Sequence, residues 1–350
     1  MEVAILDGGL SELGSSVGQS PLWSTQAVID HPEAIVNAHL AYIRAGAKVI
    51  ETATYQADVS NLMAAGLREK GAQRTMQKAV ELAQQARAIG PPGESIRIAL
   101  SLGPFGATLR PTQEFLGYYP PPHGPQQFSE TGLNTRTFDT EEDEEAAIDA
   151  LAQFHFQRLL VYCADQLAWD AIDYIAFETV LLEREVKSIR KAMTQLTEHL
   201  SSANQEFTKR WWISFVCPEP GDIRNIKTLA NAAIHDDSGK YLHLDGIGIN
   251  CTSIQHLHPC LMQLNEAVPR SLASRMFLVF YPNGGEYDTE KQSWKPRGDE
   301  DANRWATQLA NFLRSLDASR WNGVIGGGCC RTDPSYIEKL NQEAMSSRLG

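Results

Sequence analysis

Two adjacent cysteines, Cys329 and Cys330, follow three glycines near the end of the 350-residue chain. Four interpretations compete for this pair. A disulfide between sequence neighbours closes a strained ring, two buried structural thiols need no preceding glycines, and a phosphate loop lacks its lysine here. A metal site fits the pattern, because glycine lets the backbone turn so that both sulfurs reach one ion. The local pattern leaves these alternatives open.

A third cysteine, Cys251, ends the apolar run at 246–250, just as Cys329 ends the run at 323–327. If both runs are strands of one barrel, their carboxyl ends meet at the same face. Three sulfurs leave one position open on a tetrahedral zinc ion, as in catalytic sites, whereas structural sites usually have four protein ligands. The spacing therefore predicts one zinc ion per chain with a place for a substrate.

The remaining cysteines and the nearby histidines are weaker candidates. Cys163 and Cys260 fall within helical patterns, so we expect both to be packing residues. Cys217 ends the run at 211–217 and is the best spare ligand. His256 or His258 is the alternative that would close the site with a fourth protein ligand.

Zinc bound by three thiolates carries a net negative formal charge. It is then a poor Lewis acid toward a carbonyl group, and its soft sulfur ligands favour the binding of another sulfur. A substrate thiol bound there loses its proton, whereas a free thiol has a pKa of about 8.5 and is mostly protonated at neutral pH. We therefore expect alkyl transfer from a cationic donor to a zinc-bound thiolate, with no protein general base.

The elements that must position these sulfurs alternate along the chain. Continuous apolar runs are typical of strands that are covered on both faces; they lie at 3–6, 48–52, 96–102, 174–179, 211–217, 246–250, 276–281 and 323–327. Helical patterns lie between them, at 36–47, 73–89, 143–168, 182–200, 222–235, 254–267 and 305–316, and a last helix is expected from Pro334. A strand followed by a helix, eight times over, predicts an α/β fold, a (β/α)8 TIM-type barrel. An open doubly wound sheet is the alternative.

One segment, at 119–145, interrupts this alternation. It begins with prolines and ends with an acidic run, so we expect it to lie outside the core, as a lid or as a disordered insertion. Its acidic end is typical of a first helical turn. We otherwise expect residues 1–350 to form a single domain.

Composition narrows the classes of function. The net charge of −12 disfavours binding to nucleic acid or to anionic membranes. No signal peptide is visible, and no apolar stretch approaches the roughly 20 residues that span a bilayer. Six cysteines without secretion signals favour a reducing compartment, so a cytoplasmic protein with small-molecule substrates is expected.

Several motifs, taken together, resemble those of the homocysteine S-methyltransferases. In the family's order they are LDGGLSELG, ETATYQA, SLGPFGATL, FLGYY, AFETV, GIGINCTS, YPNGGEYD and IGGGCCRT. The resemblance implies a (β/α)8 barrel that holds zinc through Cys251, Cys329 and Cys330. It also implies homocysteine as the methyl acceptor and methionine as the product, which is a step of amino-acid biosynthesis.

The resemblance further implies that Asp7 and Glu178 bind the amino group of homocysteine. Both follow or end predicted strands and so face the same end of the barrel. The alternatives are a turn aspartate before two glycines and a glutamate paired with an arginine. Gly8, Thr54 and Asn250 are weaker candidates for substrate binding, and Asn250 could equally cap backbone groups.

The methyl donor is the open half of the reaction. S-methylmethionine, S-adenosylmethionine, betaine and a methylated corrinoid or folate are the candidates, and the last two normally need further domains. The motif at 281–288 resembles members that use sulfonium donors more than the betaine branch. Because aromatic faces attract cations, four residues are candidates for the donor pocket, with ordinary packing as the alternative: Phe105, Tyr118, Tyr281 and Trp294.

Three other functions stay open at this point. The first is a betaine-dependent homocysteine methyltransferase. The second is a non-catalytic zinc or redox-sensing protein, in which Cys329 and Cys330 cycle between thiol and disulfide. The third is a hydrolase, for which the sequence offers no clear set of histidine or carboxylate ligands.

The segment at 119–145 is longer than we expect in bacterial members of the family, which bears on donor preference and not on the zinc site.

Overall fold

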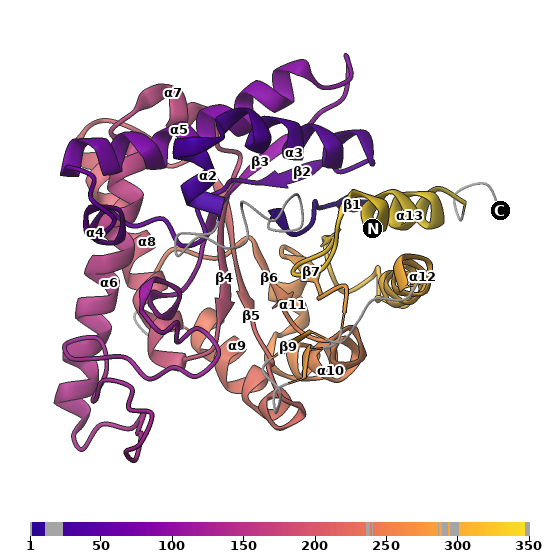
Figure 1. Cartoon of the computed structure of the whole chain (residues 1–350). Coiled ribbons are helices and arrows are strands. Elements are labelled where there is room, and N and C mark those ends of the chain that lie inside the picture. The colour runs from indigo at the N-terminus through magenta and orange to yellow at the C-terminus, as the bar shows by residue number, and fades with distance from the viewer. Residues whose placement is uncertain are drawn as a thin grey trace.

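The computed structural model of the chain describes residues 2–10, 24–235, 239, 241–285, 287–288, 293–294 and 301–346. Eight parallel strands form its central sheet (Figure 1) in the order β1-β10-β7-β6-β5-β4-β3-β2. Their bounds are β1 (Glu2–Ile5), β2 (Val49–Glu51), β3 (Arg97–Leu102), β4 (Tyr174–Val180), β5 (Arg210–Phe215), β6 (Gly246–Asn250), β7 (Phe277–Tyr281) and β10 (Gly323–Gly326). A separate antiparallel pair joins β8 (Tyr287–Asp288) to β9 (Ser293–Trp294).

The sheet closes on itself between β1 and β2. A parallel bridge joins Leu6 to Val49. The Lys48 amide donates to the Ile5 carbonyl (2.7 Å), and the Asp7 amide donates to the Val49 carbonyl (3.0 Å). The predicted (β/α)8 barrel is therefore confirmed, and the open doubly wound sheet is wrong. All eight predicted strands are present, and their ends differ from the predicted ones by two residues at most.

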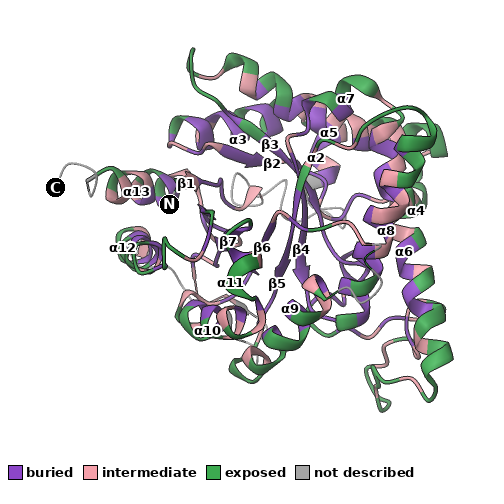
Figure 2. Ribbon diagram, turned by 180° about the vertical axis from the view of Figure 1, so that it is seen from behind, coloured by how far each residue is buried: buried purple, intermediate pink, exposed green. Residues whose placement is uncertain are grey.

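Helices surround the strands (Figure 1) and bury one face against them, as the purple inner and green outer faces in Figure 2 show. They are α2 (Ser24–Asp30), α3 (Pro32–Arg44), α4 (Val59–Ala64), α5 (Glu69–Ile89), α6 (Glu141–Cys163), α7 (Gln166–Ala171), α8 (Glu183–Ser202), α9 (Ile226–Ile234), α10 (Leu257–Ala267), α11 (Arg270–Ala273), α12 (Asp301–Arg314) and α13 (Pro334–Ser346). Short 3-10 turns are η2 (Phe105–Thr108), η3 (Pro220–Asn225) and η4 (Ile254–His256). In the described parts of the chain, no helix is long and apolar enough to cross a lipid bilayer.

Two sequence predictions about helices need correction. The helix predicted at 143–168 is two helices, α6 and α7, because the Asp165 carboxylate accepts a hydrogen bond from the Ala168 amide (3.0 Å) and so starts a new helix. The segment at 119–145 was expected to lie wholly outside the core, but Tyr119 is fully buried. The acidic run at its end does form the first turn of α6, and the Thr140 hydroxyl caps it by accepting from the Asp143 amide (3.1 Å).

Aromatic rings fill the amino-terminal end of the barrel. Tyr174, Trp212 and Phe277 come from the starts of β4, β5 and β7, and their ring centroids lie 5.5 to 6.1 Å apart. Gly246 leaves room for them, because a Cβ atom there would lie 2.4 Å from the Phe277 ring. With this end packed, polar side chains gather at the carboxyl ends of the strands, which is the end that carries the active site in barrels of this kind.

Candidate metal centre

The three predicted cysteine ligands meet at the carboxyl ends of two strands. Cys251 directly follows β6, and Cys329 and Cys330 follow β10 after two further glycines. Their Sγ atoms all lie within 4.8 Å of one another, and the Sγ atoms of Cys251 and Cys330 are 3.6 Å apart. Ligands at about 2.3 Å from a tetrahedral zinc ion are spaced about 3.8 Å apart. The three sulfurs therefore fit one zinc ion, with a fourth position left for another ligand.

Backbone hydrogen bonds to the end of β7 hold the sulfurs in this arrangement. The Cys251 amide donates to the Tyr281 carbonyl (3.1 Å), and the Cys329 amide donates to the Pro282 carbonyl (2.9 Å). Cys251 has a φ of 49°, which turns the chain sharply at the end of β6. A left-handed conformation costs a non-glycine residue about 1–2 kcal/mol, so the surrounding hydrogen bonds must offset this strain.

Glycines let the loop after β1 lie directly against the cysteine loop. A Cβ atom at Gly8 would lie 2.6 Å from the Thr332 Oγ1 atom, and one at Gly9 would lie 2.9 Å from the Cys329 carbonyl oxygen. The Gly9 amide donates to the Thr332 carbonyl (3.0 Å). Close approach of these two loops brings Asp7 next to the sulfurs.

Three buried carboxyl groups lie beside Cys329. Asp7 Oδ2 accepts a hydrogen bond from the Glu51 amide (3.0 Å), whereas Asp7 Oδ1 and Glu51 Oε1 are buried with no hydrogen-bond partner among the described residues. Glu178 accepts a short hydrogen bond from the Ser101 hydroxyl. In the described part of the chain Glu178 forms no direct ion pair, and the charge of Arg158 acts on it from a distance.

Burial and mutual repulsion disfavour negative charge on these groups. Burial is the main cause that raises the pKa of Asp7 and of Glu51 well above their ordinary values, and Glu178 raises both further. Burial, then the charge of Cys329, raises the pKa of Glu178 to about 8. Hydrogen bonds among the thiols, followed by burial, raise the pKa of Cys251 well above its ordinary value. A bound cation would reverse each of these shifts, because it favours the ionised forms.

Glu51, Glu178, Cys251 and Cys329 line a cavity of about 110 Å³, whereas Asp7 is not part of its lining. Among the described residues that line it, none is lysine, arginine or histidine, so its polar wall can attract cations and offers no basic group to an anion. The lining residues are Gly8, Gly9, Leu10, Glu51, Thr52, Tyr55, Ser101, Glu114, Phe115, Glu178, Thr179, Cys251, Gly328, Cys329 and Cys330.

Besides Asp7, two other predicted substrate residues lie close to this cavity but not in its lining. The Thr54 hydroxyl donates to the Ser101 carbonyl (2.7 Å) and contacts the Thr52 hydroxyl (2.6 Å), so Thr52 lines the cavity and Thr54 supports it from behind. The Asn250 side chain accepts from the Thr179 amide (2.7 Å) and donates to the Thr179 hydroxyl (2.8 Å). It thereby holds Thr179 at a φ of 61°. Asn250 thus caps a backbone group, which was the alternative to substrate binding.

None of the four predicted donor-pocket aromatics lines the cavity. Phe105 packs behind it, with its ring stacked on His123 at 3.9 Å. Tyr118 stacks on Phe128 at 6.0 Å. Tyr281 is buried inside the barrel, where its hydroxyl contacts the Ser214 hydroxyl (2.7 Å). Trp294 lies in β9, with the Arg331 guanidinium 6.0 Å from its ring centre.

The weaker metal ligands also lie elsewhere. Cys217 contacts Cys260, with 3.4 Å between their Sγ atoms, and both are fully buried. Cys163 ends α6, and burial raises its pKa to about 12. In the described residues, the group that could hold a metal ion contains the three predicted cysteines without His256 or His258.

Sequence reasoning missed several residues of the cavity wall. Glu51 and Ser101 end or lie within predicted strands, and the rule that sites form at strand ends could have identified them. Tyr55 and Phe115 fall inside the ETATYQA and FLGYY motifs. Glu114 carries no signal of its own, since it lies in an irregular loop after η2.

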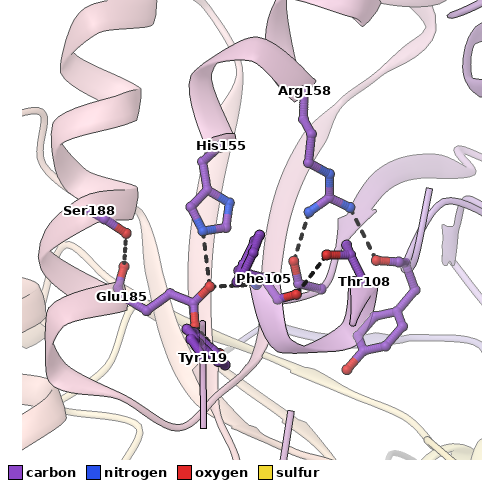
Figure 3. A network of polar contacts seen from close by, with 9 residues as sticks. Phe105, Thr108, Tyr119, His155, Arg158, Glu185 and Ser188 are labelled. Atoms are coloured by element: carbon purple, nitrogen blue, oxygen red, sulfur yellow. Dashed lines mark hydrogen bonds and ion pairs between the residues drawn. The ribbon is translucent and has the colours of Figure 1, made fainter. Parts of the chain in front are cut away.

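A buried network fixes the loop that follows β3 (Figure 3). Glu185, in the first turn of α8, accepts hydrogen bonds from the Phe105 amide (2.6 Å), the Tyr119 hydroxyl (2.6 Å) and His155 Nε2 (3.2 Å). Burial alone would raise the pKa of Glu185, but the hydrogen bonds from His155, Tyr119 and the Phe105 amide hold it below its usual value. Burial lowers the pKa of His155, so a neutral imidazole donates to the carboxylate.

A second buried charge joins the loops after β2 and β3. The Arg158 side chain, from α6, donates to the carbonyls of Ala57 (3.1 Å), Gly103 (2.8 Å) and Tyr55 (3.1 Å). Figure 3 shows this guanidinium beside the Glu185 network. Together the two side chains hold the segments that carry Tyr55 and Glu114 against the barrel.

Comparison with known proteins adds independent information. A family model described as homocysteine S-methyltransferase matches residues 4–344. The homocysteine S-methyltransferase of Escherichia coli (strain K12) is 28% identical over 348 residues, which cover 97% of this chain and 94% of that protein. Homocysteine S-methyltransferase YbgG of Bacillus subtilis (strain 168) is 27% identical over 359 residues, which cover 98% of this chain and 94% of that protein.

Among solved structures, the homocysteine methyltransferase MmuM from Escherichia coli is similar along almost its whole length. Its metallated form matches with a TM-score of 0.64 at 26% identity, covering 98% of this chain and 96% of that one. Its oxidized form gives the same TM-score at 27% identity.

The Glu185 network yields a stability prediction. We expect Glu185→Gln to lower the free energy of unfolding by about 2–4 kcal/mol at about pH 7, because it removes a buried carboxylate with three donors. A lowered folded-state pKa stabilises the fold above the ordinary value of about 4.3 and loses this effect as the pH falls through the lowered value. The loss caused by the substitution should therefore shrink near about pH 4 in urea unfolding.

Glu183→Gln is the matched control, since Glu183 lies in the same helical turn but is exposed and forms a surface ion pair with Lys187. It should change the free energy of unfolding by less than about 0.5 kcal/mol. Equal stability of the Glu185→Gln variant and the parent at neutral pH would contradict the assignment of an ionised, hydrogen-bonded Glu185.

Proposed function

Because the chain belongs to the homocysteine S-methyltransferase family, as its motifs predict, we propose that it takes its methyl group from S-methylmethionine and holds one zinc ion at Cys251, Cys329 and Cys330. The prediction that the protein is an enzyme of methyl transfer to homocysteine is confirmed. The observation that supports the finer proposal is the meeting of three sulfurs at a cavity lined by acids and, in the described residues, by no basic group.

Asp7 and Glu178 bind the ammonium group of homocysteine in this proposal. Asp7 Oδ1 is a buried acceptor with no partner among the described residues, and an ammonium group would supply one. The two carboxyl groups lie near Cys329, so they orient the thiol of the same molecule toward the cysteines. A zinc ion bound at those cysteines would supply the positive charge that keeps the homocysteine sulfur as a thiolate.

The transfer needs no proton from the protein. The homocysteine thiol releases its proton to solvent as it becomes a thiolate, and its sulfur then forms a bond to the methyl carbon. The bond between that carbon and the sulfonium sulfur breaks, and its electron pair stays on the leaving sulfur, which becomes a neutral thioether. Both products from S-methylmethionine are methionine. The protein contributes position and charge, because bound reactants held about 3–3.5 Å apart react without the entropic cost of meeting.

A comparison of methyl donors tests the proposed use of S-methylmethionine. With purified protein and isotope-labelled homocysteine, kcat/KM for S-methylmethionine should exceed that for S-adenosylmethionine or betaine by at least ~10-fold. Labelled methionine is the readout, since it separates the methylated acceptor from the demethylated donor. Preference for betaine would overturn the sulfonium proposal and leave the family assignment intact.

A cysteine substitution tests the metal site. Cys329→Ser should lose bound zinc and lower kcat/KM by at least ~100-fold, because a three-sulfur site cannot keep the ion with two sulfurs. Native mass spectrometry reports the zinc content separately from activity. Cys163→Ser is the control, since Cys163 ends α6 outside the cluster. Normal methylation by the Cys329→Ser variant after exhaustive chelation would end the zinc proposal.

Two carboxamide substitutions test acceptor binding. Asp7→Asn and Glu178→Gln should each raise the KM for homocysteine roughly 10- to 100-fold with unchanged zinc content, because each removes a charged hydrogen bond to the ammonium group. 4-Mercaptobutanoate, which lacks that amino group, is the matched acceptor, and both variants should use it as poorly as the parent does. If the variants also used 4-mercaptobutanoate less well than the parent, the carboxyl groups would act on the metal site instead.

A further inference from the structure

Glu114 is a buried acid that the acceptor and metal proposals leave unused. It lies in the irregular loop between η2 and α6, is 3% exposed and lines the cavity. Its Oε2 atom is buried with no hydrogen-bond partner among the described residues. A buried carboxylate oxygen without a hydrogen-bond donor is unfavourable, and a ligand that supplies positive charge would offset this cost at Oε2.

Glu114 is separate from the acids that face Cys329. Asp7, Glu51 and Glu178 influence one another and Cys329 electrostatically, whereas Glu114 interacts with Thr112 and Arg110. The charge of Glu114 acts on Tyr55, as do the charges of Cys251 and Glu178, and among the acids Glu114 contributes the larger effect. The cavity therefore has two acidic positions, one beside Cys329 and one beside Tyr55.

No cation of the cavity wall pairs with Glu114. The lining residues include no basic group in the described part of the chain. Arg110 is exposed, and its guanidinium donates to the carbonyls of Leu109 (2.7 Å) and Ala107 (3.4 Å). Its charge is consequently screened by solvent.

The surroundings of Glu114 suit a sulfonium ion. Tyr55 and Phe115 line the cavity next to it, and aromatic faces attract cations that cannot donate hydrogen bonds. Tyr55 also lies close enough to Cys251 to sense its charge. A cation held between Glu114 and these rings would therefore lie next to the sulfur cluster, where its methyl group must be to react.

We propose that Glu114, with Tyr55 and Phe115, forms the donor subsite and binds the positive charge of the sulfonium sulfur. This inference rests on the proposed use of a sulfonium donor. The two acidic positions then bind different cationic groups, the ammonium group of homocysteine beside Cys329 and the sulfonium group of the donor beside Tyr55. Selection for a cationic donor follows, because a neutral thioether leaves Glu114 without a counter-charge.

The experiment compares a charged ligand with its neutral counterpart. In zinc-loaded Glu114→Gln protein with saturating homocysteine, the KM for S-methylmethionine should rise roughly 10- to 100-fold. The inhibition constant of methionine, competing with the donor, should change by less than ~3-fold, since methionine keeps the amino group and lacks the sulfonium charge. The KM for homocysteine and the zinc content should stay at the parent values.

Glu130→Gln is the matched control, because Glu130 is an exposed acid in the same connecting segment. Glu114→Asp keeps the charge, so its KM for S-methylmethionine should lie between those of Glu114→Gln and the parent. This variant tests the role of the charge even if the glutamine variant folds poorly. If Glu114→Gln weakened the binding of S-methylmethionine and of methionine equally, or weakened neither, the proposed donor subsite would be overturned. A parent enzyme that prefers a donor other than a sulfonium would instead overturn the proposed function.

Discussion

The site depends on bringing three sulfur atoms from two distant strand ends within 4.8 Å of one another. Thiols have no intrinsic reason to gather, and their mutual contact and burial raise the pKa of Cys251. The backbone supplies the constraint instead. Hydrogen bonds from Cys251 to Tyr281 and from Cys329 to Pro282 tie both loops to the end of β7. The barrel is what makes such ties possible, because every strand end lies at the same rim.

Charge is distributed unevenly around this rim. The cavity wall carries acids and, in the described residues, no bases, whereas buried basic and acidic groups lie just behind it. The Arg158 guanidinium donates to backbone carbonyls, and Glu185 fixes the loop after β3 (Figure 3). Buried charge thus shapes the wall from behind and leaves the negative groups of the wall free for ligands.

The sequence was sufficient to predict the barrel and the meeting of the three cysteines. The strands are continuous apolar runs, and Cys251 and Cys329 each follow such a run, so the common rim places them together. The roles of Thr54 and Asn250 could not be predicted, because a one-residue difference decides whether a side chain faces the cavity or the layer behind it. Glu114 and Phe115 lie in an irregular loop, where no periodicity indicates direction. Among the predicted donor aromatics, Tyr118 also lies in an irregular loop, whereas Tyr281 ends β7 with its side chain buried inside the barrel.

The pairing of β1 with β10 also determines at which stage of synthesis the site can form. The β1 strand is held between β10 and the bridge from Leu6 to Val49. Asp7 follows β1, whereas Cys329 and Cys330 follow β10, which is more than 300 residues further along the chain. During synthesis the Asp7 carboxyl group stays exposed to solvent until β10 has emerged and paired with β1. The cluster of three cysteines is consequently complete only after β10 has been made, and a nascent chain stalled before β10 would carry just one of its three sulfurs.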